Sequence, residues 1–155
     1  MSILINRTQI IGDLCEYLRT AVTDFVVVRP YHGELDRYSK KAQVKEETFP
    51  IMVNIQTPFA LIISKDRKRL ENSGASLKFR HDLSIYIGVA NRHDFSNQSV
   101  PAIFDLLTKC TDALHGKVFF KGAGALNVES DGEYLITTDL FTVYDQKYYQ
   151  LEIGR

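Results

Sequence analysis

The chain has 155 residues, of which 45% are hydrophobic and 25% are charged, so it has the length and composition of one folded domain rather than of a disordered protein. Its 19 basic and 19 acidic residues cancel, which argues against a protein that grips nucleic acid through a general basic excess. The longest apolar runs span only a few residues, which excludes a transmembrane helix, and we expect no membrane association.

The first predicted element is a helix that begins after Asn6 and ends near Thr23. Asn6 is a good N-cap with Gln9 three residues later, and apolar residues follow at helical spacing. Residues 25–28 are aromatic and valine-rich, which predicts a buried strand. Pro30 should end that strand, because proline cannot donate a backbone hydrogen bond.

The middle of the chain predicts a loop followed by strands. Residues 33–48 are polar and lack periodicity, whereas residues 51–55 are typical of a strand and residues 59–63 either extend it or form another. Residues 77–91 follow a two-residue alternation of mainly apolar and mainly polar side chains, which predicts a long strand with one buried and one wet face. Because turn residues precede this strand, residues 59–91 should form a long hairpin with its basic charges toward the tip.

The last third predicts a second helix and then more strands. The helix should begin near Ser99 and end before Gly116, a typical C-terminal glycine. Strands are expected at 118–121, 125–128, 134–144 and 148–153, with turns at 122–124 and 131–132. The predicted fold is a single α+β domain over residues 1–155, with two helices packed on a mostly antiparallel or mixed sheet. We expect a core that includes Leu14, Leu18, Ile85, Ile87, Phe104 and Leu107.

The sequence holds no arrangement typical of a catalytic or metal site. The tripeptide Arg-His-Asp occurs around His81 and again around His93, but on one extended strand ~3.3 Å per residue would place them about 40 Å apart. We therefore expect two solvated positions near strand ends. Cys15 and Cys110 match no metal-ligand or redox spacing, and Cys110 lies on an apolar helical stripe. We expect a non-enzymatic protein without cofactor or metal, made in a reducing cytosol.

Charge is unevenly distributed along this neutral chain. Residues 65–80 carry a net +4 and residues 125–155 a net −4, which is a pattern that bears on association. The candidate interaction residues are Lys65, Arg67, Lys68 and Arg69 in the basic segment, and Glu129, Asp131, Glu133 and Asp145 in the acidic one. The basic segment is either an ordinary solvated hairpin tip or a contact surface for an acidic partner or nucleic acid. It lacks interleaved aromatic residues, which disfavours sequence-specific single-strand binding.

Short motifs follow one another in a set order behind the N-terminal helix and the valine-rich strand. They are YHGELD at 31–36, PIMV at 50–53, YIGVANR at 86–92, LL at 106–107, ALHG at 113–116 and LFTVY at 140–144. In this order and spacing, the chain resembles the tail-terminator-like proteins of Mu-type phages and prophages.

The resemblance implies a structural virion protein of the tail and neck, assembled in the host bacterial cytoplasm. Such proteins are thought to form a homo-oligomeric ring, commonly hexameric, that stops growth of the tail tube protein and joins the tail to the neck or connector protein. DNA leaves through the channel of such a ring, which allows non-specific contact with it. The alternative is a small adaptor or regulatory protein-binding module of non-viral origin.

The two charged segments suggest how such a ring could be held together. A closed ring of identical subunits needs two unlike, complementary patches on each subunit. We expect the basic hairpin to meet the acidic segment of a neighbouring subunit or a tail protein. The alternative is that the basic hairpin points into the channel and faces passing DNA.

Overall fold

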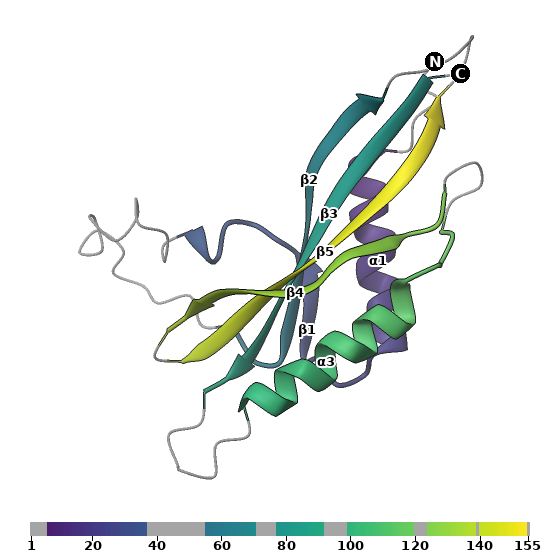
Figure 1. The fold of residues 1–155 in the computed structure, drawn as a ribbon. Helices are drawn as coiled ribbons and strands as arrows, with labels where there is room; N and C mark the ends of the chain where they lie inside the picture. Colours follow the sequence, from purple (N-terminus) through teal and green to yellow (C-terminus); the bar gives the residue numbers. More distant parts are fainter. Residues whose placement is uncertain are drawn as a thin grey trace.

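The computed structural model describes residues 6–36, 55–70, 77–91, 99–119, 124–138 and 140–154. Within these residues the elements are α1 (Arg7–Ala21), β1 (Val27–Pro30), β2 (Phe59–Leu70), β3 (Leu77–Ala90), α3 (Ser99–Leu114), β4 (Asn127–Thr137) and β5 (Phe141–Gly154). The strands form one mixed sheet in the order β1-β2-β3-β5-β4, in which only the β1–β2 pair is parallel (Figure 1). The predicted single α+β fold is confirmed. Neither described helix has the length and apolar character needed to span a bilayer.

The first helix begins and buries its apolar stripe as the sequence predicts. The Asn6 side chain accepts hydrogen bonds from the backbone N–H groups of Thr8 at 2.8 Å and Gln9 at 3.3 Å, which satisfies two of the donors left open at a helix start. The buried residues of α1 are Ile10, Ile11, Leu14, Cys15 and Leu18. The following strand has the predicted length but begins two residues later, at Val27, and Val26 is exposed.

The predicted long hairpin is present as the antiparallel pair β2–β3. β2 runs for 12 residues, well beyond the apolar segment that predicted it. Its register shifts between Ser64 and Asp66, which marks a bulge, and the polar half of the strand continues the pairing beyond it. Of the strand predicted at 51–55, residues 51–54 lie outside the described residues, and Ile55 is buried but precedes β2 without being part of a strand.

The expectation that β3 has one wet face is wrong for its second half. Ser84 and Tyr86, on the supposedly wet side, are 1% and 6% exposed. A second apolar cluster covers that side of the sheet, and it includes Leu35 and Ile55 from segments outside the strands. Alternation cannot reveal this cover, because it comes from distant parts of the chain.

In the part of the C-terminal region that the structure describes, two long strands stand in place of the four predicted ones, and residues 120–121 lie outside the described residues. Val118 and Phe119 lie outside any strand, and β4 continues through the predicted Asp131-Gly132 turn. The register of β4 shifts between Ser130 and Glu133, so the residues that suggested a turn form an irregularity in an edge strand. The reversal into β5 comes later, where Thr138 Oγ1 accepts hydrogen bonds from the backbone N–H groups of Leu140 and Phe141, both at 3.1 Å.

Both helices pack on one face of the sheet and supply its main core. The predicted core residues Leu14, Leu18, Ile85, Ile87 and Leu107 are all buried. Phe104 is the exception, since it is 48% exposed. The buried stripe of α3 consists of Ile103, Leu106, Leu107, Cys110 and Leu114. Phe104 lies at the margin of that stripe, where its ring packs edge-on against Tyr144 instead of entering the core.

The three central strands extend together as an arm, which we define as residues 65–70 of β2, 77–82 of β3 and 149–154 of β5 (Figure 1). β4 follows β5 only as far as Tyr149, so it does not pair with the outer part of the arm. The basic half of the hairpin therefore lies on a projection with strands of the acidic C-terminal segment beside it.

Candidate interaction surface

The four basic candidates all lie on the β2 part of the arm, but they differ in exposure. Lys65, Lys68 and Arg69 are exposed. Only 12% of the Arg67 side chain is exposed. The cross-strand register puts Arg67 beside His81 and Arg69 beside Phe79, on the helix-covered face of the sheet, and Lys68 on the other. The basic segment is thus divided between two faces.

Arg67 is engaged inside its own subunit. Its Nε lies 2.9 Å from Glu152 Oε2, and its Nη2 donates to Glu152 Oε1 at 3.2 Å. The Glu152 side chain is only 3% exposed, and burial raises the pKa of its carboxyl against the opposing effect of Arg67. Arg67 is therefore a partner for an internal charge rather than a contact residue for another molecule.

Three of the acidic candidates also have partners in the same subunit. Arg80 donates to Glu129, and Lys147 Nζ lies 3.0 Å from Glu133. Asp131 accepts a hydrogen bond from Thr111 Oγ1 at 2.7 Å. The two charged segments of the sequence thus meet within one chain, which leaves less charge for contacts between subunits.

Asp145 is the fourth acidic candidate, and it is buried rather than presented on the surface. Its residue is 6% exposed, and Oδ1 has no hydrogen-bond partner among the described residues. Burial raises the pKa of this carboxyl, while Ser84 and the charges of Lys65 and Lys147 lower it. These residues line a pocket of about 310 Å³ on the face of the sheet opposite the helices.

His81 is buried, so the expectation of a solvated position is wrong. Its Nε2 lies 2.7 Å from Ser64 Oγ, which accepts a further hydrogen bond from Arg7 Nε at 2.7 Å. Burial, followed by the charges of Arg67 and Arg7, lowers the pKa of His81 to about 4. The imidazole is therefore neutral at pH 7. Its supposed counterpart, His93, lies outside the described residues.

Both cysteines are buried in the core, as expected for Cys110. Burial raises the pKa of Cys15 to about 11 and that of Cys110 to about 12, so neither thiol ionises readily. Within the described ranges, no three His, Cys, Asp or Glu side chains gather closely enough to hold a metal ion.

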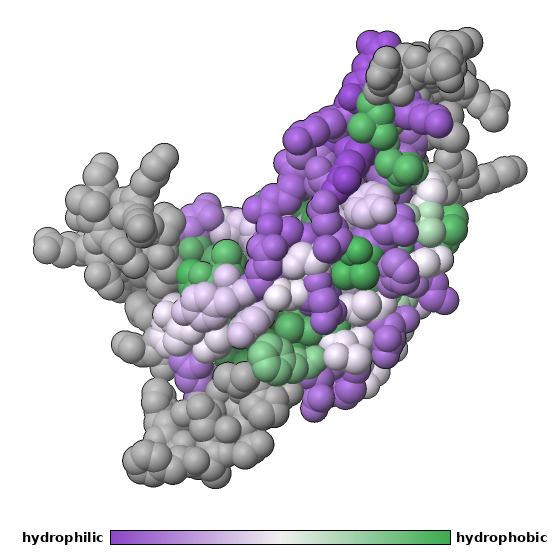
Figure 2. Space-filling model, in the orientation of Figure 1, coloured by the Kyte–Doolittle hydropathy of each residue, from purple (hydrophilic) through white to green (hydrophobic). Residues whose placement is uncertain are grey.

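An exposed aromatic surface lies where α3 meets the open edge of the sheet, and sequence reasoning did not identify it. We define the aromatic edge as Phe104, Tyr134 and Tyr144. The Tyr144 ring packs edge-on against both of the others, at 5.7 Å from Phe104 and 6.0 Å from Tyr134. Phe104 is 48% and Tyr134 61% exposed. Figure 2 shows hydrophobic side chains gathered between β4 and the first turns of α3.

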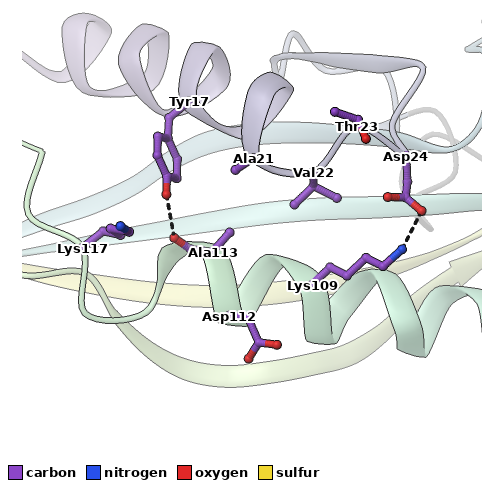
Figure 3. A pocket seen from close by; sticks show the side chains of 9 residues that line it. All are labelled: Tyr17, Ala21, Val22, Thr23, Asp24, Lys109, Asp112, Ala113 and Lys117. Carbon is purple, nitrogen blue, oxygen red and sulfur yellow. Dashed lines mark hydrogen bonds and ion pairs between the residues drawn. The ribbon is translucent and has the colours of Figure 1, made fainter.

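A second hollow lies between the two helices and has a volume of about 550 Å³ (Figure 3). Lys109 Nζ lies 2.8 Å from Asp24 Oδ2, and the Tyr17 hydroxyl donates to the backbone oxygen of Ala113 at 3.3 Å. These bonds join α1 and the turn after it to α3. The hollow is therefore the open side of the helix–helix contact, where polar groups hold the two elements together.

A scan of protein-family models and a search of curated proteins both gave no match to the chain.

Proposed function

We propose that this protein is a ring-forming structural component of a phage tail, similar to a tail terminator, that caps the tail tube and joins it to the neck. The resemblance in the order of short motifs motivates the proposal. The observation that supports it is that two sides of the subunit differ in chemistry, one carrying exposed aromatic residues and the other exposed basic residues. Closed rings of identical subunits need such unlike, complementary patches.

The β4 side carries the aromatic edge beside three exposed acidic residues. β4 is an edge strand, and Tyr134 and Leu135 on it are 61% and 37% exposed. Tyr134, Phe104 and Tyr144 form the aromatic edge, a surface of the kind that association commonly covers, since aromatic residues are enriched in interface centres.

The arm is the cationic side. Lys65, Lys68 and Arg69 are exposed there, and β1 at the β2 side of the sheet is only 4 residues long. Because β1 ends at Pro30, strand pairing between β1 and a neighbour's β4 could involve few residues. Side-chain contacts therefore carry most of the association in this proposal, with charge setting the register.

Light scattering after size-exclusion chromatography, combined with negative-stain imaging, tests the proposal. We expect closed rings of one diameter, formed by the protein alone or on tail tubes, with a mass that is a multiple of 17.7 kDa. A protein that stays monomeric in both settings would overturn the ring and favour the adaptor module.

Substitutions on the aromatic edge sharpen the test. Phe104→Ser and Tyr134→Ser should each weaken association at least about tenfold, because aromatic side chains at interface centres contribute strongly to binding. Val118→Ser is the matched control, since Val118 is 60% exposed but follows the other end of α3. Equal effects of all three substitutions would contradict a specific contact at the aromatic edge.

Charge reversal at Lys68 and Arg69 distinguishes a contact between subunits from a channel-lining arm. Loss of rings in the double variant supports the contact between subunits. Rings that form normally but lose a salt-sensitive affinity for DNA support the channel position. Arg67 is left unchanged, because its reversal would disturb the buried pair with Glu152.

A further inference from the structure

The pocket around Asp145 holds a buried carboxylate that Ser84 hydrogen-bonds, but whose Oδ1 lacks a donor among the described residues. The pocket has a volume of about 310 Å³, and its charged and hydroxyl-bearing lining residues are Lys65, Asp82, Ser84, Glu129, Asp145, Lys147 and Tyr148. Asp145 is only 6% exposed, and its Oδ1 has no hydrogen-bond partner among the described residues. Leaving a buried charged acceptor unpaired is costly, so an outside donor would be strongly favoured.

The other charges of the pocket are already engaged. Arg80 donates to both Asp82 and Glu129, and Lys147 pairs with Glu133 at 3.0 Å. Lys65 Nζ instead lies 5.3 Å from the centre of the Tyr86 ring. Of the three carboxylates that line the pocket, Asp145 alone has no ion pair within the part of the chain that the structure describes.

A guanidinium group suits this carboxylate better than the other cations do. It is planar, it donates two parallel hydrogen bonds to one carboxylate, and it is less strongly hydrated than an ammonium group. A divalent metal ion would need several carboxylate or carbonyl oxygens, and here two of the three carboxylates are held by Arg80 while two lysines stand nearby.

Among the described residues, Arg69 is the guanidinium that fits the role in charge and exposure. It is exposed, and no ion pair joins it to another described residue. It cannot reach Asp145 of its own chain. Arg69 shares a face of the sheet with Phe79 and Glu152, whereas Asp145 points from the opposite face of β5.

We propose that the Asp145 pocket of one subunit binds the Arg69 guanidinium of a second copy of this chain. The contact rests on the proposed ring, and it identifies Asp145 and Arg69 as one pair of complementary residues on neighbouring subunits. The arm of one subunit lies against the non-helical face of the next, so the interaction is head-to-tail. Because Lys65 repels an incoming cation, Lys65→Met should strengthen the contact.

The test compares self-association of the wild type, Asp145→Asn, Arg69→Gln and the double variant by analytical ultracentrifugation. Each single substitution should weaken association about tenfold to a hundredfold, since a hydrogen bond to a charged group is lost. The double variant should self-associate no more weakly than either single variant, because both substitutions remove the same contact. Lys78→Gln, which removes an exposed arm charge next to Phe79, is the matched control and should have little effect.

Mixing the two single variants shows whether the contact lies between subunits. An Asp145→Asn subunit keeps its Arg69, and an Arg69→Gln subunit keeps its Asp145, so one intact contact can form between them. The mixture should therefore associate more tightly than either variant alone. A mixture no tighter than its components overturns the proposal.

Stability measurements separate this contact from a structural role. Asp145→Asn should make the isolated subunit more resistant to urea while weakening association, because it removes a buried charge that has no ion pair among the described residues. A less stable subunit would overturn the assignment. Rings that form normally from both variants refute the contact and leave the proposed function standing. If the effects of the two substitutions on association are coupled but no closed ring forms, the contact is supported and the ring is refuted. A wild type that never self-associates refutes both.

Discussion

The Phe59 ring fills the space that a side chain on Gly88 would need. The two residues are cross-strand partners in β2 and β3, and a Cβ on Gly88 would lie 2.2 Å from Phe59 Cζ. Phe59 is fully buried and also packs edge-on against Phe141, so its ring has little freedom to move.

Gly88→Ala should therefore destabilise the protein by about 1–3 kcal/mol, the usual cost of overpacking a core. Gly12→Ala is the control, because Gly12 lies exposed in α1 with no atom within 4 Å of the added carbon. That substitution should stabilise the helix by about 0.5–1 kcal/mol. Urea unfolding of both variants measures how each substitution changes the free energy of unfolding. Changes of the same sign in the two variants would contradict the close contact at Gly88.

Leu107 and Gly132 form a second tight contact, here between α3 and β4. Leu107 is buried, and a Cβ on Gly132 would lie 2.6 Å from Leu107 Cδ1. Leu107→Ala should cost about 2–5 kcal/mol of stability. Gly132→Ala should be unfavourable in the wild type but much less so in the Leu107→Ala variant, where the added methyl has room. Gly132→Ala combined with Leu14→Ala in α1 should be additive, and additivity in both pairs would refute the contact.

Stability should fall as the pH drops below 7 because of His81. The native state lowers the pKa of this imidazole to about 4, and a charged ring would bury an Nδ1–H group without an acceptor. The unfolded chain takes up the proton near pH 6.5, so it binds more protons than the native state between about pH 6.5 and 4. This contribution to stability is present above about pH 6.5 and is lost as the pH falls toward 4.

His81→Gln should remove this dependence while keeping a polar partner for Ser64. Between pH 7 and 5 the wild type should lose about 2 kcal/mol more than the variant. Glu152 and Asp145, whose pKa values are raised, contribute with the opposite sign in both proteins. The difference between the two urea titrations therefore isolates His81, and parallel curves would show that it stays uncharged in both states.

The Arg67–Glu152 pair should matter more to folding than its place in a charged segment suggests. Arg67→Met leaves a buried carboxylate unpaired and should cost about 3–5 kcal/mol. The double substitution of both residues by Met should recover most of that loss. Lys68→Met breaks the exposed pair with Asp66, whose side chain is 50% exposed, and should change stability by at most about 1 kcal/mol. Equal costs for Arg67→Met and Lys68→Met would contradict the internal role of Arg67.

Local signals in the sequence located the elements that depend on local physics. The Asn6 cap and the apolar spacing behind it placed α1, and the alternation of residues 77–91 placed β3. The same signals misplaced a turn at Asp131-Gly132, because the residues that suit turns also suit irregular positions in an edge strand.

The burial and the partners of each charged residue could not be predicted from the sequence, because they depend on which distant strands become neighbours. His81 looked solvated, yet its partners Ser64 and Arg7 come from β2 and the start of α1. The +4 and −4 segments suggested contacts between subunits, and β2, β3 and β5 instead bring Arg67 to Glu152 within one chain. Asp145 was identified as a candidate by its charge, whereas its burial follows from the tertiary fold.

The position of β3 at the centre of the sheet has a consequence for when the protein can fold during synthesis. Its pairing with β5 begins at Leu77 and Gly154, so β3 cannot complete this pairing until β5 has been synthesised. Contacts this distant in sequence form slowly, and one edge of β3 stays open while the ribosome still holds the C-terminal strand. β3 therefore becomes a central strand only after β5 has left the ribosome, and assembly of subunits follows that step.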